Sequence, residues 1–335
     1  MPASPTTDPH AAPPLREIGR TGIRVTPVAM GCWPIAGVTS INVTEEHSLA
    51  TLEAAADAGI NFFDTAYIYG YEGESERLIG RALGHRRGEL VIASKCGLHW
   101  GPDRTQVRDA RPETIRRECE ESLRRLQTDV IDLYYLHAPD PATPLAESAA
   151  ALRQLLDEGK VRAVGVSNFS RIEQYEEFNA VCPISADQPH YNMLQREIEA
   201  DRLPWCRAHN VSVIPYWPLM KGLLAGRITR DHTFDPRDGR RKYPIFMGQE
   251  WERNQDFLDR IRPIAERQGR TVAQLAVAWV VQQPGITAAL CGAKRPEQIR
   301  ETAEAMNWEL TDADLAEIRD AIRLRGEVAS RPAVQ

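Results

Sequence analysis

The sequence predicts a single-domain α/β protein with the architecture of a (β/α)8 TIM barrel and long βα loops. Short apolar runs alternate with amphipathic segments, as expected for parallel βα units. Eight such units need about 250 residues, and the chain has 335. The apolar runs lie at 25–30, 60–63, 90–94, 130–136, 161–166, 184–187, 211–215 and 286–290.

Helix signals mark the segments between these runs. Thr44 suits the N-cap of the first helix, and Gly59 and Gly159 suit the position that ends a helix. We therefore expect helices to connect most of the strands. The amphipathic segments lie at 44–58, 74–83, 112–126, 144–158, 170–178, 198–209 and 271–282.

The barrel accounts for most of the chain, and the surplus falls outside it. Residues 1–14 are rich in Pro, Ala and Thr, lack the pattern of a secretory signal and are predicted to form a disordered tail. The barrel is predicted to span 15–325, with a C-terminal tail at 326–335. An insert at 226–250 has two interpretations: a mobile flap over a cofactor, or a solvated loop.

Composition excludes several classes of function. The net charge of −6 and pI near 5.8 argue against nucleic acid or a membrane as a partner. No apolar run approaches the ~20 residues of a membrane span. The six cysteines form no CxxC pair, which favours reduced thiols in the cytoplasm and no metal site. The GxGxxG fingerprint of a doubly wound dinucleotide fold is absent.

Four polar residues follow three of the predicted strands. Asp64 and Tyr69 come after 60–63, Lys95 ends the next run, and His137 ends the third. The carboxyl ends of barrel strands carry the chemistry of this fold. A lysine beside a tyrosine lowers the phenol's pKa from about 10, a carboxylate can hold that lysine, and a histidine can donate to a substrate oxygen. This combination suits carbonyl reduction by hydride transfer. Taken singly, each residue has an ordinary structural interpretation; together they favour a site.

Three motifs carry a resemblance to a known family. They are GINFFDTAYIYG from Gly59 to Gly70, ASK from Ala93 to Lys95, and DVIDLYYLH from Asp129 to His137. With them the chain resembles the aldo-keto reductase superfamily from about residue 15 to about residue 321. The resemblance implies a catalytic tetrad of Asp64, Tyr69, Lys95 and His137, with Tyr69 as general acid/base. It also implies a barrel that binds NADPH without a Rossmann domain.

The resemblance further implies a cofactor site. Ser167, Asn168 and Gln188 hold the nicotinamide carboxamide, and Tyr216 stacks on the nicotinamide ring. The segment from Leu219 to Gly226 wraps the pyrophosphate, and the candidates from Gly292 to Glu301 lie at the adenosine end. The candidates are Ser167, Asn168, Gln188, Tyr216, Leu219, Gly222, Leu223, Gly292, Lys294, Arg295, Gln298 and Glu301.

The cofactor and the substrate pocket are less sharply defined. Lys294 and Arg295 favour NADP(H), with NAD(H) as the alternative. Ala293 and Thr302 depart from the serine and asparagine that many family members carry there, which weakens that preference. An apolar mouth that accepts a small carbonyl or alcohol is predicted from Trp33, Tyr67, His99 and Trp100.

Several functions remain open at this stage. The first is an NADPH-dependent carbonyl reductase, or an alcohol or aldose dehydrogenase in reverse. An NAD-dependent sugar dehydrogenase of the same fold is an alternative. So is a cofactor-binding regulatory subunit that resembles potassium-channel beta subunits. A barrel isomerase or lyase would use Lys95 as a Schiff-base amine, although pairing with Asp64 argues against that role. The pattern does not predict the oligomeric state.

Overall fold

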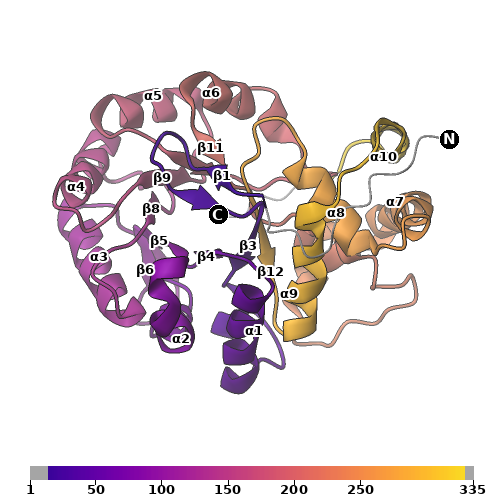
Figure 1. The fold of residues 1–335 in the computed structure, drawn as a ribbon, viewed down its shortest axis with the longest axis horizontal. Coiled ribbons are helices and arrows are strands. Elements are labelled where there is room, and N and C mark those ends of the chain that lie inside the picture. The colour runs from indigo at the N-terminus through magenta and orange to yellow at the C-terminus, as the bar shows by residue number, and fades with distance from the viewer. Residues whose placement is uncertain (1–13, 329–335) are drawn as a thin grey trace.

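Eight parallel strands form a closed barrel in this computed structural model, which describes residues 14–328 (Figure 1). The last two strands close the ring: Thr287 N donates to Val213 O at 2.8 Å and Leu290 N to Pro215 O at 2.9 Å. The predicted fold is therefore confirmed, and each apolar run overlaps a barrel strand. The strands are β3 (Val28–Gly31), β4 (Phe62–Asp64), β5 (Val91–Cys96), β8 (Leu133–Leu136), β9 (Val164–Ser167), β10 (Ala186–Gln188), β11 (Ser212–Val213) and β12 (Ala289–Gly292).

Helices surround the barrel, and the predicted segments match seven of them. Thr44 caps the first helix by accepting a bond from His47 N at 3.2 Å. Gly59 and Gly159 follow helices with φ of 84° and 73°, a backbone region that glycine enters without strain. The surrounding helices are α1 (Glu45–Asp57), α2 (Glu74–Leu83), α3 (Pro112–Leu126), α4 (Leu145–Asp157), α5 (Ile172–Val181), α6 (Arg202–His209), α8 (Val272–Val281) and α9 (Pro296–Ala303).

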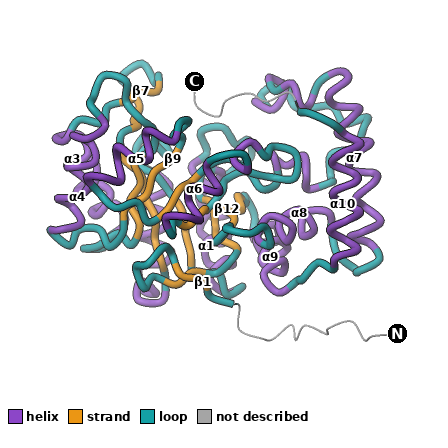
Figure 2. The backbone as a smooth tube through the Cα atoms, turned by 90° about the horizontal axis from the view of Figure 1, so that it is seen from above, coloured by secondary structure: helices purple, strands orange, loops and turns teal. Residues whose placement is uncertain are grey.

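A hairpin seals the N-terminal end of the barrel. It is formed by β1 (Arg16–Glu17) and β2 (Arg24–Val25), and Ile18 and Ile23 pack with the side chains of the barrel interior. The Arg16 guanidinium donates to the carbonyl oxygens of Val281 at 2.7 Å and Ile286 at 3.0 Å. A second hairpin lies at the opposite end of the barrel (Figure 2). It consists of β6 (Leu98–Trp100) and β7 (Gln106–Arg108).

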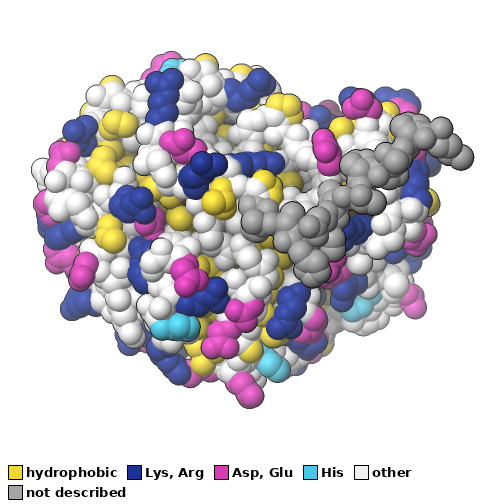
Figure 3. Space-filling model, in the orientation of Figure 1, with side chains coloured by type: hydrophobic (Ala, Val, Ile, Leu, Met, Phe, Trp, Pro, Cys, Tyr) yellow, Lys and Arg dark blue, Asp and Glu magenta, His cyan; other side chains and the backbone are white. Residues whose placement is uncertain are grey.

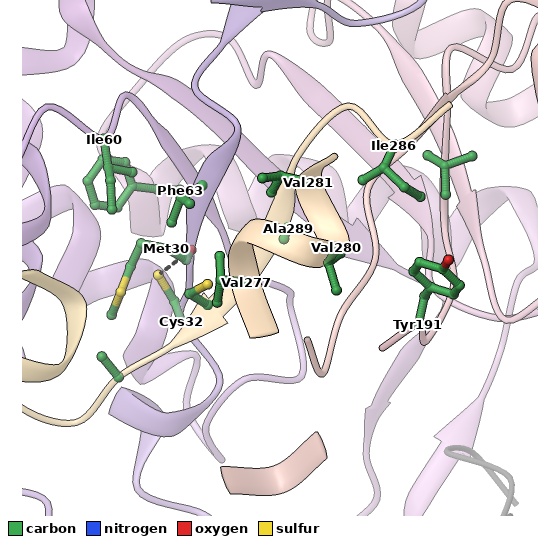
Figure 4. Packing of buried hydrophobic residues seen from close by; sticks show 14 of the residues in the cluster. Met30, Cys32, Ile60, Phe63, Tyr191, Val277, Val280, Val281, Ile286 and Ala289 are labelled. Carbon is green, nitrogen blue, oxygen red and sulfur yellow. Dashed lines mark hydrogen bonds between the residues drawn. The ribbon is translucent and has the colours of Figure 1, made fainter. Parts of the chain in front are cut away.

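A larger apolar cluster fills the space between strands and helices. Figure 4 shows Val277, Val280 and Val281 of α8 beside two residues at the start of the last strand. Ile286 precedes β12, and Ala289 is its first residue. Every residue of α8 is buried. Because burial of an aliphatic side chain contributes about 1.5–3 kcal/mol, this layer is the main source of cohesion between sheet and helices.

Two helices lie outside the ring (Figure 1), α7 (Gly248–Glu266) and α10 (Asp312–Arg325), and pack on each other. The predicted insert leads directly into α7, which the sequence reasoning did not predict. Arg230 of the insert contacts three carboxylates of α7 at 2.6–2.8 Å, those of Glu252, Asp256 and Asp259. These ion pairs therefore fasten the first part of the insert to α7.

The surface in Figure 3 intersperses cationic and anionic side chains. Within residues 14–328, no helix has the length and apolar character needed to cross a membrane. All six cysteines are buried free thiols. The predicted tails at 1–14 and 326–335 lie largely outside the described residues.

The burial of one acidic side chain is only partly compensated. Asp187 on β10 is 1% exposed, and neither carboxylate oxygen has a hydrogen-bond partner within the described chain. Burial raises its pKa to about 7, although Arg202 and Tyr175 oppose this shift. Ionised Asp187 is therefore a cost to the fold, because a buried charge without a bonding partner is unfavourable.

Replacement of this acid by its neutral amide should stabilise the protein at high pH. The pKa of Asp187 rises from about 3.9 in the unfolded chain to about 7 in the fold. Between these two pKa values the folded state keeps a proton that the unfolded state has released, so the free energy of unfolding falls as pH rises. The loss is complete once pH has passed 7. We expect Asp187→Asn to gain ~2–4 kcal/mol near pH 8 and less near pH 5. Urea unfolding across this range measures it, with exposed Asp129→Asn as the control. An equal change at both pH values would contradict it.

Candidate active site

The polar side chains predicted to form a tetrad lie together at the C-terminal end of the barrel. Asp64 ends β4, Lys95 lies in β5, His137 follows β8, and Tyr69 is on the loop after β4. Lys95 Nζ is 2.6 Å from Asp64 Oδ1 and 3.4 Å from the Tyr69 hydroxyl. The rings of Tyr69 and His137 are 5.9 Å apart, edge to face. Parallel strands in register thus bring four residues from distant segments to one place.

A buried ion pair forms the base of this site. Lys95 is 0% exposed and also donates to Thr65 O at 2.6 Å. The other carboxylate oxygen of Asp64 accepts from Gln188 Nε2 at 2.7 Å. Burial lowers the pKa of Lys95 and raises that of Asp64, while the attraction between the two opposes both shifts. An ammonium with these partners is a fixed cation and not a nucleophile, which argues against a Schiff-base role.

Tyr69 differs from the sequence prediction in its acidity. Burial, and then the charge of Asp64, raise the pKa of Tyr69 well above its ordinary value of 10. The prediction that Lys95 lowers this pKa treated Asp64 only as the group that holds the lysine. Since the carboxylate is as close to the lysine as a hydrogen bond allows, its charge offsets the ammonium and burial dominates. Tyr69 is consequently a protonated phenol at neutral pH.

His137 is held by its backbone more than by its ring. Its N–H donates to Cys96 O at 2.9 Å, and its carbonyl accepts from Asn168 Nδ2 at 2.8 Å. Burial, with Lys95 second, lowers the pKa of His137 well below its ordinary value, so the imidazole is neutral. Nδ1 has no hydrogen-bond partner among the described residues. A neutral imidazole presents one N–H donor and one acceptor.

Polar groups suited to an amide lie beside the tetrad. Ser167 Oγ donates to Gln188 O at 2.8 Å, and Asn168 Nδ2 lies 3.1 Å from Ser167 Oγ. The Tyr216 hydroxyl donates to Asn168 Oδ1 at 3.1 Å. Asn168 adopts φ of 59°, a left-handed conformation that asparagine tolerates. These hydrogen bonds connect the tetrad to Tyr216 through Gln188 and Asn168.

The predicted pyrophosphate segment forms two short 3-10 pieces within Met220–Ala225, separated by a kink at Lys221 and Gly222. Gly222 has φ of 90°, and its N–H donates to Leu219 O at 2.8 Å. Leu223 is fully buried in the outer apolar cluster, so its side chain anchors the turn. Any ligand here contacts the turn's backbone and not the Leu223 side chain.

Cations gather at the predicted adenosine end. Lys294 and Arg295 precede α9, whose N-terminus favours anions. Burial, and then Arg240 of the insert, lower the pKa of Lys294, with Arg295 acting in the same sense. The insert therefore lies beside this end of the site. Arg240 is paired with Asp238 at 2.6 Å, and the remaining cations, Lys294 and Arg295, favour a negatively charged ligand.

Three further candidates border these cations. Gln298 Oε1 accepts from Lys294 N at 2.8 Å, and Gly292 is exposed at the end of β12. Glu301 Oε2 contacts Arg227 of the insert at 2.7 Å, while its Oε1 is buried without a partner in the described chain. Glu301 thus retains an acceptor for a ligand's hydroxyl or amine group.

Aromatic rings wall the mouth of the site. Trp33 lies edge to face with Tyr69 at 4.9 Å. Trp100 donates through Nε1 to Ile68 O at 2.9 Å and packs against Tyr71 at 5.1 Å. Tyr71 is 39% exposed and was absent from the sequence prediction, although it follows Tyr69 by two residues.

Two further pocket candidates, Tyr67 and His99, are hydrogen-bonded to a neighbouring helix. The Tyr67 hydroxyl donates to Glu121 at 2.7 Å, and His99 Nδ1 lies 2.8 Å from Glu118 Oε1. Both carboxylates belong to α3. Because side chains alternate along a strand, Trp100 and its neighbour His99 face opposite sides of β6. Tyr67 and His99 thus fasten the loops to α3.

Known proteins match this chain along most of its length. The model of the Aldo/keto reductase family matches residues 27–323. Aldo-keto reductase YhdN of Bacillus subtilis (strain 168) is 38% identical over 305 residues, or 90% of this chain and 91% of that protein. The NADH-specific methylglyoxal reductase of Escherichia coli (strain K12) is 35% identical over 320 residues, covering 90% and 96% of the two chains.

A solved structure agrees with these relatives. Glycerol dehydrogenase AKR11B4 from Gluconobacter oxydans has a TM-score of 0.88 and 38% identity, covering 97% of this chain and 99% of that one. The match extends over the whole barrel, and the fold and the sequence point to the same family. The chain therefore belongs to the aldo-keto reductase family and is an NAD(P)H-dependent oxidoreductase.

Proposed function

We propose that the protein reduces an aldehyde or ketone to an alcohol with NADPH, or catalyses the reverse oxidation, with Tyr69 as the general acid/base. The observation that carries the proposal is the Tyr69 hydroxyl, 3.4 Å from a lysine that Asp64 holds in place. Carbonyl reduction generates negative charge on oxygen, and a phenol that is protonated at neutral pH is suited to neutralise it.

The residues fit a nicotinamide cofactor along the whole site. Asn168 and Gln188 offer the amide groups that a carboxamide needs, and Tyr216 supplies an aromatic face. At the other end, Lys294 and Arg295 suit a 2′-phosphate, since charge-assisted bonds to phosphate are strong. Glu301 Oε1, buried without a partner in the described chain, suits a ribose or adenine donor. When bound, the cofactor supplies or accepts the hydride.

Each tetrad residue then has a separate task. Tyr69 delivers its proton to the substrate oxygen as negative charge develops there. Lys95 stabilises the resulting phenolate, and the hydrogen bond from Lys95 to Asp64 keeps the ammonium beside Tyr69. Neutral His137 orients the substrate oxygen as a hydrogen-bond donor. The aromatic rings of Trp33 and Trp100 exclude water from the reacting centre.

The substrate is proposed to be a small carbonyl compound or alcohol. The indole N–H groups of Trp33 and Trp100 are already bonded within the protein, to Thr39 at 2.8 Å and to Ile68 O at 2.9 Å. The mouth therefore offers aromatic faces to a substrate. Methylglyoxal and glycerol, named for relatives of this chain, are suitable compounds for a first screen.

Loss of the Tyr69 hydroxyl should abolish most of the turnover. Tyr69→Phe keeps the ring packed on Trp33 and removes the proton donor, so we expect kcat to fall by about 10²–10⁴ with cofactor affinity retained. Steady-state rates on the carbonyl found by screening measure this effect. Tyr67→Phe is the matched control, since that hydroxyl bonds to α3. A Tyr69→Phe enzyme that works near the native rate would place the acid elsewhere.

The protein should bind NADPH more tightly than NADH. Lys294→Met removes one cation from the 2′-phosphate position, and we expect it to weaken NADPH binding by about 10-fold or more while NADH binding changes little. Fluorescence titration of both cofactors measures this difference. Lys242→Met, on the exposed part of the insert, is the control for loss of charge. Preference of the native protein for NADH would instead favour an NAD-dependent dehydrogenase.

A further inference from the structure

The candidate proton donor, Tyr69, lies at the end of a tight turn. Tyr69 N donates to Ala66 O at 2.9 Å, so that Tyr67 and Ile68 are the two central residues of the turn. The N–H group of Tyr67 donates to Lys95 O at 3.0 Å, which ties the turn to β5. The conformation of this turn determines where the Tyr69 side chain begins, and the carbonyl group of Tyr67 has a partner of its own.

Arg125 of α3 holds this carbonyl group. Arg125 Nη1 donates to Tyr67 O at 3.3 Å, and the guanidinium carbon lies 4.3 Å from the centre of the Tyr67 ring. A planar guanidinium can donate along its edge and stack through its face, so one arginine holds both the backbone and the ring of Tyr67. The Tyr67 hydroxyl is not part of these contacts, since it bonds to Glu121.

A buried carboxylate fixes Arg125 in turn. Glu76 of α2 is 0% exposed, and its Oε2 accepts from Arg125 Nη1 at 3.2 Å. Its Oε1 accepts from Ser94 Oγ at 2.6 Å, and Ser94 directly precedes Lys95 in β5. Both oxygens of the carboxylate are therefore bonded, as a buried charge requires. This second ion pair joins α2, α3 and β5 beside the turn that carries Tyr69.

The chain closes tightly around the guanidinium. Gly73, the N-cap of α2, has φ of 75°, and a Cβ atom there would lie 2.5 Å from Arg125 Nη1 and 2.6 Å from its Cζ. Glycine adopts this conformation without strain and leaves the space that the guanidinium fills. Any side chain at position 73 would displace Arg125. The packing thus gives Arg125 one position between Tyr67, Glu76 and Gly73.

We propose that Arg125 is a positioning residue for Tyr69: by holding the central peptide of the turn, it fixes the Tyr69 hydroxyl beside Lys95, where the substrate oxygen is to be protonated. This inference rests on the proposed function, since it acts through the general acid. Within the described chain, the hydrogen bonds and ion pairs of Arg125 go to Tyr67, Glu76 and Glu121 and not to the tetrad. Its effect on turnover therefore passes through the turn.

The test uses a substitution that keeps the charge. Arg125→Lys leaves an ammonium for the buried Glu76, but a lysine has no planar fork to hold a carbonyl group and a ring together. Arg124→Lys is the matched control, because Arg124 is the neighbouring residue of α3, is exposed and donates to Glu120 O one turn earlier in the same helix. Thermal unfolding verifies that both variants are folded.

Turnover and cofactor affinity separate positioning from general damage to the site. We expect kcat of Arg125→Lys to fall about 10–100-fold, the effect of a misplaced catalytic group. The affinity for NADPH, measured by fluorescence titration, should stay at the native value, because the turn is not among the proposed cofactor contacts. Arg124→Lys should alter neither quantity. Native turnover of Arg125→Lys would overturn the inference and leave the proposed function intact.

A double-mutant cycle with Tyr69→Phe shows whether the effect passes through the phenol. Without the hydroxyl there is no proton donor to position, so adding Arg125→Lys to Tyr69→Phe should lower kcat by less than about twofold. An equal loss in both backgrounds would overturn the inference, because a structural defect acts whether or not the hydroxyl is present. If Tyr69→Phe alone keeps native turnover, the proposed function fails, and the inference fails with it.

A second variant keeps the inference testable if Arg125→Lys does not fold. Gly73→Ala retains both charges of the ion pair and places a Cβ atom where the guanidinium now lies. We expect it to lower kcat in the native background and to have little effect in the Tyr69→Phe background. Native turnover of Gly73→Ala, or an equal loss in both backgrounds, would contradict the role of Arg125.

Discussion

The arrangement of the site depends on the ion pair between Asp64 and Lys95. Two charges buried this deeply each carry a large desolvation cost, so they are retained only where additional hydrogen bonds complete their shells. Thr65 O completes the shell of the lysine and Gln188 that of the carboxylate. Through Gln188 the same pair is connected to Ser167, Asn168 and Tyr216. The catalytic and the cofactor regions thus share one electrostatic anchor.

This pair also determines the protonation states around it. A lone buried lysine would favour a phenolate at Tyr69, but burial and the charge of Asp64 keep the phenol protonated, while burial and the charge of Lys95 keep the imidazole of His137 neutral. In such a site the lysine acts when charge forms on the phenol during a reaction, and not in the resting protein. The balance suits a proton donor better than a permanent base.

The sequence was sufficient to predict the barrel and the grouping of the tetrad residues. The reason is that the carboxyl ends of the strands in a parallel barrel lie together at one end, independently of the loop conformations. It failed where orientation matters. His99 and Trp100 are adjacent in the sequence, and only the packing of β6 on α3 shows that His99 bonds to Glu118. The acidity of Tyr69 was misjudged because burial depends on every neighbouring element. By contrast, α7 had a signal: Trp251, Leu258 and Ile261 recur at helical spacing within a polar segment.

The contacts of the hairpin of β1 and β2 can be completed only late in the synthesis of the chain. Its acceptors, the carbonyls of Val281, Ile286 and Thr287, are separated from Arg16 by 265 to 271 residues. During translation these contacts of Arg16 can form only after nearly the whole chain has emerged. Contacts of such long range are slow to form. The hairpin that seals the N-terminal end of the barrel is thus synthesised first, while its contacts with the segment before the last strand are among the latest that can form.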